Sequence, residues 1–126
     1  MKLRFNKNTI RLRVSQSDLQ KLMAENELVE KVHFGGDQAN FYYKLKISGE
    51  VTAMLATCQQ GEITVTIPQE LAGDWATSGQ TGLYHEQSTA SEATLSISVE
   101  KDFQCLHKRP GENETDNFPN PLAEKS

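Results

Sequence analysis

The side chains best suited to chemistry lie close together near the C-terminus. A thiol, an imidazole and three carboxylates follow one another there: Cys105, His107, Glu112, Glu114 and Asp116. Thiolate and neutral imidazole are preferred ligands of Zn²⁺ and other transition metals. The thiol and the imidazole are two residues apart, so both can point to the same side of an extended segment. One hypothesis is therefore a metal site built from Cys105, His107 and one of the acids Glu112, Glu114 or Asp116.

The spacing of this cluster matches no familiar metal or catalytic motif. Structural zinc sites usually show paired C-x₂-C or H-x₃-H spacing, and the chain has neither. A thiolate beside an imidazole also suggests nucleophilic chemistry, which needs a positioned base and an oxyanion hole. In the structural alternative, Cys105 is a small buried hydrophobe, and Phe103, Leu106 and Phe118 hold the segment on the core. We favour this alternative, so we expect no cofactor, and the question of an enzyme stays open.

Basic side chains recur at alternate positions in two regions that are predicted to be strands. Alternate residues of a strand point to the same face of a sheet. If these strands are neighbours, one face carries Lys2 together with the candidate anion-binding residues Arg4, Arg11, Arg13, Lys44 and Lys46. Like charges at such spacing repel one another, so the face requires a negative counterpart.

Two kinds of counterpart are open. The first, which we favour, is a set of cross-strand ion pairs with the protein's own outward-facing acids, Glu50, Glu62, Glu86 and Glu100. The second is a phosphorylated small molecule, because the guanidinium fork matches phosphate geometry. Nucleic acid is disfavoured, because a pI of about 5.4 lacks the usual basic footprint of such proteins.

The apolar pattern predicts the elements that would position these side chains. Alternation predicts strands over 2–5, 10–14, 28–34, 41–47, 51–57, 62–67, 82–86 and 94–100. The four strands from 28 to 67 have short links, which favour an antiparallel meander. Helical spacing predicts a first helix, capped by Ser15 or Ser17, that buries Leu19, Leu22 and Met23. It predicts a second helix over 69–77 that packs through Leu71 and Trp75.

These elements predict an α+β fold. We expect one mostly antiparallel sheet of about seven to eight strands, curled toward a barrel, with two short helices. A chain of 126 residues is the size of one domain, which we place at 1–121. Its proline- and glycine-rich part, 103–121, is expected to be an irregular segment packed on the domain, and 122–126 a frayed tail. No internal repeat is evident.

Composition and charge narrow the class of protein. The chain is 37% hydrophobic and 24% charged, and no apolar run approaches the roughly 20 residues that span a bilayer. The first residues are charged and lack an apolar signal region, so we expect a cytoplasmic protein with no membrane association. Residues 1–46 carry nine Lys and Arg against five Asp and Glu, whereas residues 47–126 carry four against twelve. Such a split can mark an anion-binding half, but we favour the alternative in which the two halves neutralise each other within one fold.

Both ends of the chain carry distinctive strings. The first is KLRFNKNTIRLRVSQSDL at 2–19, and the second is VEKDFQCL at 99–106, followed by Arg109, Glu112, Asp116 and FPNP at 118–121. With the middle positions 63–68, Trp75 and 82–83, these strings resemble a family of short uncharacterised bacterial proteins. The resemblance implies a small single-domain bacterial protein, and it implies no activity, cofactor or partner.

The function predicted from these observations is that of a small binding or interaction module without catalysis. Phosphate-binding loops, nucleophile elbows and zinc-protease strings are missing from the sequence. An exposed sheet face or edge would bind an unknown protein partner or a second copy of the chain. The alternatives are binding or turnover of a phosphorylated small molecule on the basic sheet face, and a metal site in the C-terminal segment.

Overall fold

The computed structural model describes residues 1–36, 40–103 and 116–120 of the chain. Two helices and eight mostly antiparallel strands confirm the predicted α+β class. In chain order the elements are β1 (Lys2–Asn6), β2 (Thr9–Val14), α1 (Gln16–Glu25), β3 (Glu27–His33), β4 (Asn40–Ser48), β5 (Leu55–Gln59), β6 (Glu62–Pro68), α2 (Gln69–Thr77), β7 (Gly82–Ser88) and β8 (Thr94–Lys101).

The strands form two four-stranded sheets instead of the single curled sheet that we expected. Sheet A has the order β1-β2-β8-β7, and sheet B has the order β3-β4-β6-β5. Each sheet joins two antiparallel hairpins through one parallel pair, β2–β8 in sheet A and β4–β6 in sheet B. The predicted antiparallel meander is therefore wrong. Strand β6 is central in sheet B and pairs with β4 on one side and β5 on the other, so β5 lies at the edge. The burial of Ile63, Val65 and Ile67 fits this central position.

The chain consists of two halves with the same order of elements. The first half is β1–β2–α1–β3–β4 and the second is β5–β6–α2–β7–β8. Each sheet takes one hairpin from each half, and the registers correspond. One row across sheet A reads Leu3, Leu12, Val99, Leu83, and the equivalent row across sheet B reads Ala56, Val65, Leu45, Leu28. The repeat is one of topology and burial, with different residues, which is why the sequence does not reveal it.

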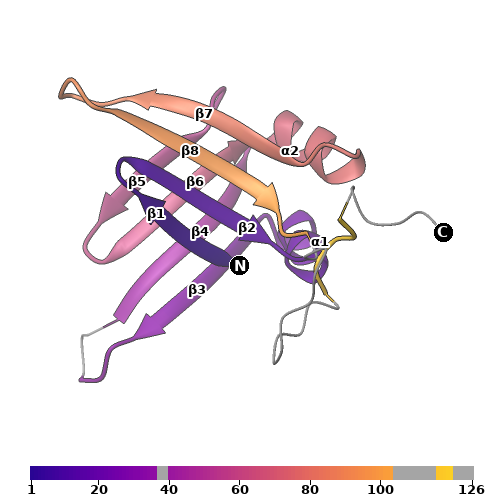
Figure 1. Ribbon diagram of the computed structural model, residues 1–126, viewed down its shortest axis with the longest axis horizontal. Coiled ribbons are helices and arrows are strands. Elements are labelled where there is room, and N and C mark those ends of the chain that lie inside the picture. Colours follow the sequence, from indigo (N-terminus) through magenta and orange to yellow (C-terminus); the bar gives the residue numbers. More distant parts are fainter. Residues whose placement is uncertain (37–39, 104–115, 121–126) are drawn as a thin grey trace.

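The inward faces of both sheets share one apolar core. Figure 1 shows the sheets crossing one over the other, with α1 and α2 at one end. The turns of β1–β2, β5–β6 and β7–β8 lie toward the opposite end (Figure 1). The core cluster joins residues of both sheets and both helices, so neither sheet buries its apolar face alone.

Helix α1 begins with the predicted cap. The Ser15 hydroxyl accepts a hydrogen bond from the Asp18 amide, and the Asp18 carboxylate accepts one from the Ser15 amide, which completes a capping box. The helix ends at Asn26, which adopts a left-handed conformation with φ of 63°. Leu19 and Leu22 are buried as predicted, but Met23 is exposed, so the buried stripe is narrower than expected.

Helix α2 packs through a different pair of residues than the sequence suggested. Ala72 and Trp75 are fully buried, whereas Leu71 is exposed. The spacing of three residues from Ala72 to Trp75 places both on the sheet-facing side, and Leu71 lies beside that stripe. The Trp75 indole donates a hydrogen bond of 3.4 Å to the Thr81 carbonyl, the acceptor that a buried indole requires.

The segment 116–120 lies against the start of α1 and the end of β8. Phe118 forms an isolated bridge with Phe103, and its amide donates to the Asp102 carbonyl at 2.8 Å. The Gln16 amide donates to the Asp116 carbonyl at 3.0 Å. Phe118 thereby packs against the core. Among the helices of the described ranges, none has the length and apolar character needed to cross a bilayer.

Candidate anion-binding site on the outer face of sheet A

The structure brings together three of the five predicted anion-binding residues. Arg4 on β1 lies directly opposite Arg11 on β2, and Arg13 lies opposite Lys2. Their alternate neighbours Ile10, Leu12 and Val14 are buried in the core, so the arginines point outward from sheet A. We call Arg4, Arg11 and Arg13 the arginine face. Sequence alternation predicted this grouping because β1 and β2 form one hairpin.

Lys44 and Lys46 belong to β4 in the other sheet and do not extend the arginine face. The Lys44 ammonium lies 3.0 Å from Glu62 and 3.8 Å from Glu27. The hydrogen bond to Glu62 is the main cause that raises the pKa of Lys44. In register, Lys46 lies opposite Glu27. Glu62 is one of the acids that the favoured alternative named, whereas Glu27 is not, and within the described residues no carboxylate lies within ion-pair distance of Lys46.

One carboxylate serves two arginines on sheet A. The Nε atoms of Arg11 and Arg13 lie 3.4 and 3.5 Å from the same oxygen, Oε1 of Glu100. The buried Arg11 Nε–H nevertheless makes no hydrogen bond within the described structure, because the Glu100 oxygen lies within ion-pair distance but outside hydrogen-bond geometry. The carboxylate thus compensates the two charges only in part.

The second oxygen of Glu100 is occupied by Tyr84, a residue that the sequence analysis did not single out. The Tyr84 hydroxyl donates to Oε2 of Glu100 at 2.7 Å, and this bond is the main cause that raises the pKa of Tyr84. Gly82 makes room for the pair, because a Cβ at this position would lie 2.8 Å from the Tyr84 hydroxyl oxygen. The alternation of Tyr84 with Leu83 was the signal available in the sequence, since it places the phenol on the outward side.

Arg4 is the least compensated cation of the arginine face. Within the part of the chain that the structure describes, no carboxylate lies within ion-pair distance of its guanidinium. Arg4 and Arg11 line a surface hollow of about 240 Å³ together with Asn6 and Thr9. This hollow combines two guanidinium groups with amide and hydroxyl side chains, which are all suited to bind phosphate or carboxylate oxygens.

A second hollow, of about 290 Å³, lies at the other end of the arginine face. Its lining includes Arg13, Glu100, Lys101 and Asp102. Asp102 is buried and pairs with the Lys2 ammonium at 2.7 Å. Lys101 is buried as well, and its ammonium donates to the Ser78 carbonyl at the end of α2 at 2.8 Å. Burial lowers the pKa of Lys101.

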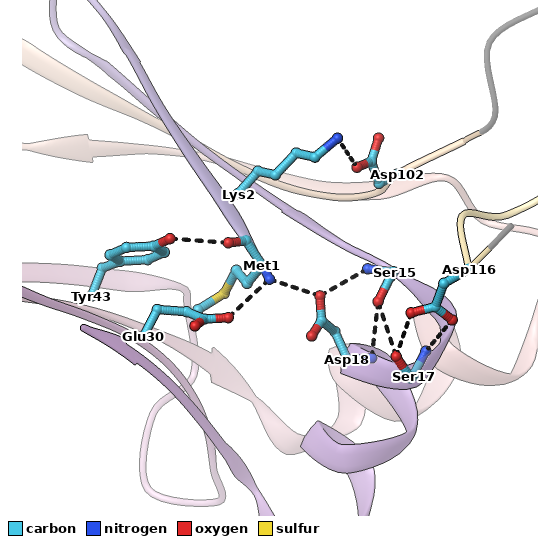
Figure 2. A network of polar contacts seen from close by, with 9 residues as sticks. All are labelled: Met1, Lys2, Ser15, Ser17, Asp18, Glu30, Tyr43, Asp102 and Asp116. Carbon is cyan, nitrogen blue, oxygen red and sulfur yellow. Dashed lines mark hydrogen bonds and ion pairs between the residues drawn. The ribbon is translucent and has the colours of Figure 1, made fainter. Parts of the chain in front are cut away.

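A polar network beside the arginine face connects β1 with α1 and sheet B (Figure 2). The Met1 amine lies 2.9 Å from Asp18 and 3.0 Å from Glu30, and the Tyr43 hydroxyl donates to the Met1 carbonyl. Burial lowers the pKa of this amine, but its hydrogen bonds to the two carboxylates outweigh burial and raise the pKa overall. For Asp18, burial acts to raise the pKa, and the bonds to the amine and to Ser15 lower it overall. The network therefore fastens the start of β1 to α1 and to sheet B.

The predicted metal site cannot be built from the described residues. Cys105, His107 and Glu112 lie outside them, and Glu114 does as well. The remaining candidate, Asp116, accepts hydrogen bonds from the amide and the hydroxyl of Ser17 at the start of α1 (Figure 2), and the hydroxyl bond is the main cause that lowers its pKa. Within the described ranges, no three His, Cys, Asp or Glu side chains lie close enough together to hold a metal ion.

Comparison with known proteins identifies the family without a function. Curated proteins give no significant match, and solved structures give none either. A family model matches residues 1–122, which is nearly the whole chain, and its description is that of a family of unknown function. The chain belongs to this family, DUF7009.

Proposed function

We propose that this protein is a non-catalytic binding module that takes a phosphorylated small molecule on the arginine face. One observation carries the proposal. Arg4 and Arg11 lie directly opposite each other and line one hollow. Of their two positive charges, only that of Arg11 has a carboxylate within ion-pair distance in the described residues, namely Glu100. Two guanidinium groups held side by side cost free energy through repulsion, and a bound dianion would remove that cost. The cytoplasmic location expected from the sequence is part of the proposal.

The size of the hollow limits how much of the ligand is enclosed. Its volume of about 240 Å³ is below the roughly 300–1,000 Å³ of typical ligand pockets. It therefore suits a single phosphoryl or diphosphoryl group, and the remainder of the ligand would lie over the outer face of sheet A. Ser98 and Tyr84 continue the same register row beyond Arg11, but Ser98 is buried and the Tyr84 hydroxyl already donates to Glu100, so the hollow itself is the anchor of the ligand.

Titration with inorganic pyrophosphate, followed by isothermal calorimetry at low and high salt, tests this proposal. We expect Arg4→Gln to weaken binding by about tenfold, because a charge-assisted hydrogen bond is lost. Arg4→Lys should also weaken binding, since an ammonium cannot replace the guanidinium fork. Lys46→Gln is the matched control, because it removes one charge from the other sheet.

Two results would overturn the proposal. The first is unchanged affinity in Arg4→Gln. The second is an equal loss in Lys46→Gln, which would indicate long-range charge attraction without a site. Release of phosphate from pyrophosphate by the wild-type protein would contradict the non-catalytic part.

A further inference from the structure

A third pocket, of about 400 Å³, lies at the end of the molecule away from the helices. Its apolar lining comes from both halves of the chain: Phe5, Ile10, Ala56, Cys58, Ile63 and Leu95. Phe5 pairs with Ile10, and Cys58 pairs with Ile63, in equivalent registers of the two hairpins. The pocket lining therefore comes mainly from the β1–β2 and β5–β6 hairpins, close to their turns. Figure 1 shows these two turns on the same side of the molecule, away from the helices.

The pocket exists because the two ends of the core are closed differently. At the helical end, Leu22 of α1 and Trp75 of α2 fill the space between the sheets and are fully buried. At the turn end the structure shows no helix across the core among the described residues (Figure 1). Phe5 shares the inward row of buried Ile10, yet 54% of its surface is exposed. An aromatic ring on an open apolar pocket is a surface that a ligand can cover.

One cation lies at this apolar pocket. Lys7 is in the turn between β1 and β2 and is part of the pocket lining. In the described part of the chain it has no ion pair, and it occupies the left-handed region with φ of 52°. The pocket thus combines a mainly apolar lining, interrupted by Asn8, Thr9 and Thr57, with one positive charge that has no ion pair in the described residues.

We propose that this pocket binds a small amphipathic carboxylate. The aliphatic chain lies between Phe5, Ile63 and Leu95, and the carboxylate pairs with the Lys7 ammonium. The apolar lining excludes a highly charged ligand, because burial of a charge without a partner is costly. The single cation selects a single anionic group. This ligand and this site differ from the phosphorylated ligand and the arginine face proposed above.

The exposed thiol of Cys58 provides a direct readout of occupancy, because it lines the pocket. The experiment measures the rate of Cys58 alkylation by iodoacetamide with increasing sodium decanoate. Peptide mass spectrometry separates Cys58 from Cys105. We expect saturating decanoate to slow alkylation of Cys58 by about tenfold, since a bound chain blocks access to a lining side chain. The neutral analogue decanol should protect only at higher concentration.

Variants assign the head group. Lys7→Gln should weaken protection by decanoate about tenfold and leave protection by decanol unchanged. Lys21→Gln, on the exposed side of α1, is the matched control and should behave as the wild type. A thermal melt of each variant verifies that the fold is retained.

Three outcomes would overturn the proposal. No protection of Cys58 by decanoate at any concentration would remove the site. If decanoate protected Cys58 from alkylation equally in Lys7→Gln and in the wild type, the carboxylate would not pair with the Lys7 ammonium. Equal weakening in Lys7→Gln and Lys21→Gln would reduce the effect to overall charge.

Discussion

The two halves of the chain have the same order of elements but distribute charge differently. In both halves the helix buries the residues four and seven positions after its N-cap, Leu19 and Leu22 in α1, Ala72 and Trp75 in α2. The central rows of both sheets are apolar as well. The repeated topology thus constrains the core. Equivalent core positions can carry side chains of different size, provided that the summed side-chain volume still fills the core.

The repeated topology does not constrain the charged residues on the outer faces of the two sheets. In sheet A the cation Arg11 on β2 lies beside Ser98 on β8, whereas in sheet B the cation Lys44 on β4 lies beside Thr64 on β6. Two carboxylates surround Lys44, but Glu100 alone serves Arg11 and Arg13. Both outer faces keep cations without an ion pair in the described residues, Arg4 on sheet A and Lys46 on sheet B. Only on sheet A do two neighbouring arginines share one carboxylate oxygen, and this arrangement locates the candidate site.

One equivalent pair breaks the apolar pattern of the inside. Ile47 in sheet B pairs with Ile67, and its counterpart Lys101 in sheet A pairs with Val14. Both side chains are buried. The ammonium of Lys101 reaches the Ser78 carbonyl and lies 5.5 Å from the centre of the Phe118 ring. The charged residue therefore links the end of α2 with the segment that contains Phe118, a link that sheet B does not have at this position.

The largest expected effect tests whether the halves share one core. Leu22→Ala should lower the free energy of unfolding by about 2–5 kcal/mol, and Trp75→Ala by about 3–5 kcal/mol, because each leaves a cavity in a fully buried position. Urea denaturation followed by circular dichroism measures both. A single transition is expected in each variant. Two separate transitions would show that each half is stable by itself.

The Lys101 link should have an intermediate effect. Lys101→Ala leaves the Ser78 carbonyl without its donor, which costs about 1–3 kcal/mol. Lys101→Met also removes this donor but keeps most of the side-chain volume, so its cost should be smaller than that of Lys101→Ala, which leaves a cavity in addition. The same denaturation experiment ranks the two variants. A cost for Lys101→Met equal to that for Lys101→Ala would show that the ammonium itself is required.

The smallest effect concerns the two helix starts. Asp18 at the third position of α1 completes a capping box, whereas α2 has exposed Leu71 at the same position and no side-chain cap. Asp18→Asn should cost about 1 kcal/mol at pH 7, and Leu71→Asn less than about 0.5 kcal/mol.

The cost of Asp18→Asn should also depend on pH. Because the pKa of Asp18 is lowered in the folded state, its contribution is present above its unfolded pKa of about 4 and is lost as pH falls through the folded pKa. Stability curves from pH 7 to pH 2 measure this. A cost that stays constant over this range would contradict an ionic role for Asp18.

Much of the fold could be predicted from local pattern. Alternation located most of the strands, and the S-x-x-D sequence at Ser15 predicted the cap of α1. The expected strand over 51–57 was shifted, because only Leu55–Gln59 pairs with β6. Leu71 and Met23 were expected inside and are exposed. The spacing of apolar residues along the sequence shows which side of a helix or strand they share. It does not show how far the neighbouring helix or strand extends over that side.

The sequence by itself determined which side chains alternate, and so it determined that Arg4, Arg11 and Arg13 share one face of one hairpin. Only the tertiary structure decided that Lys44 and Lys46 lie in a different sheet, that Glu100 is divided between two arginines, and that Lys7 lies at an apolar pocket. The physical reason is that side-chain direction follows from the local geometry of a strand, whereas strand order follows from the burial of the whole core.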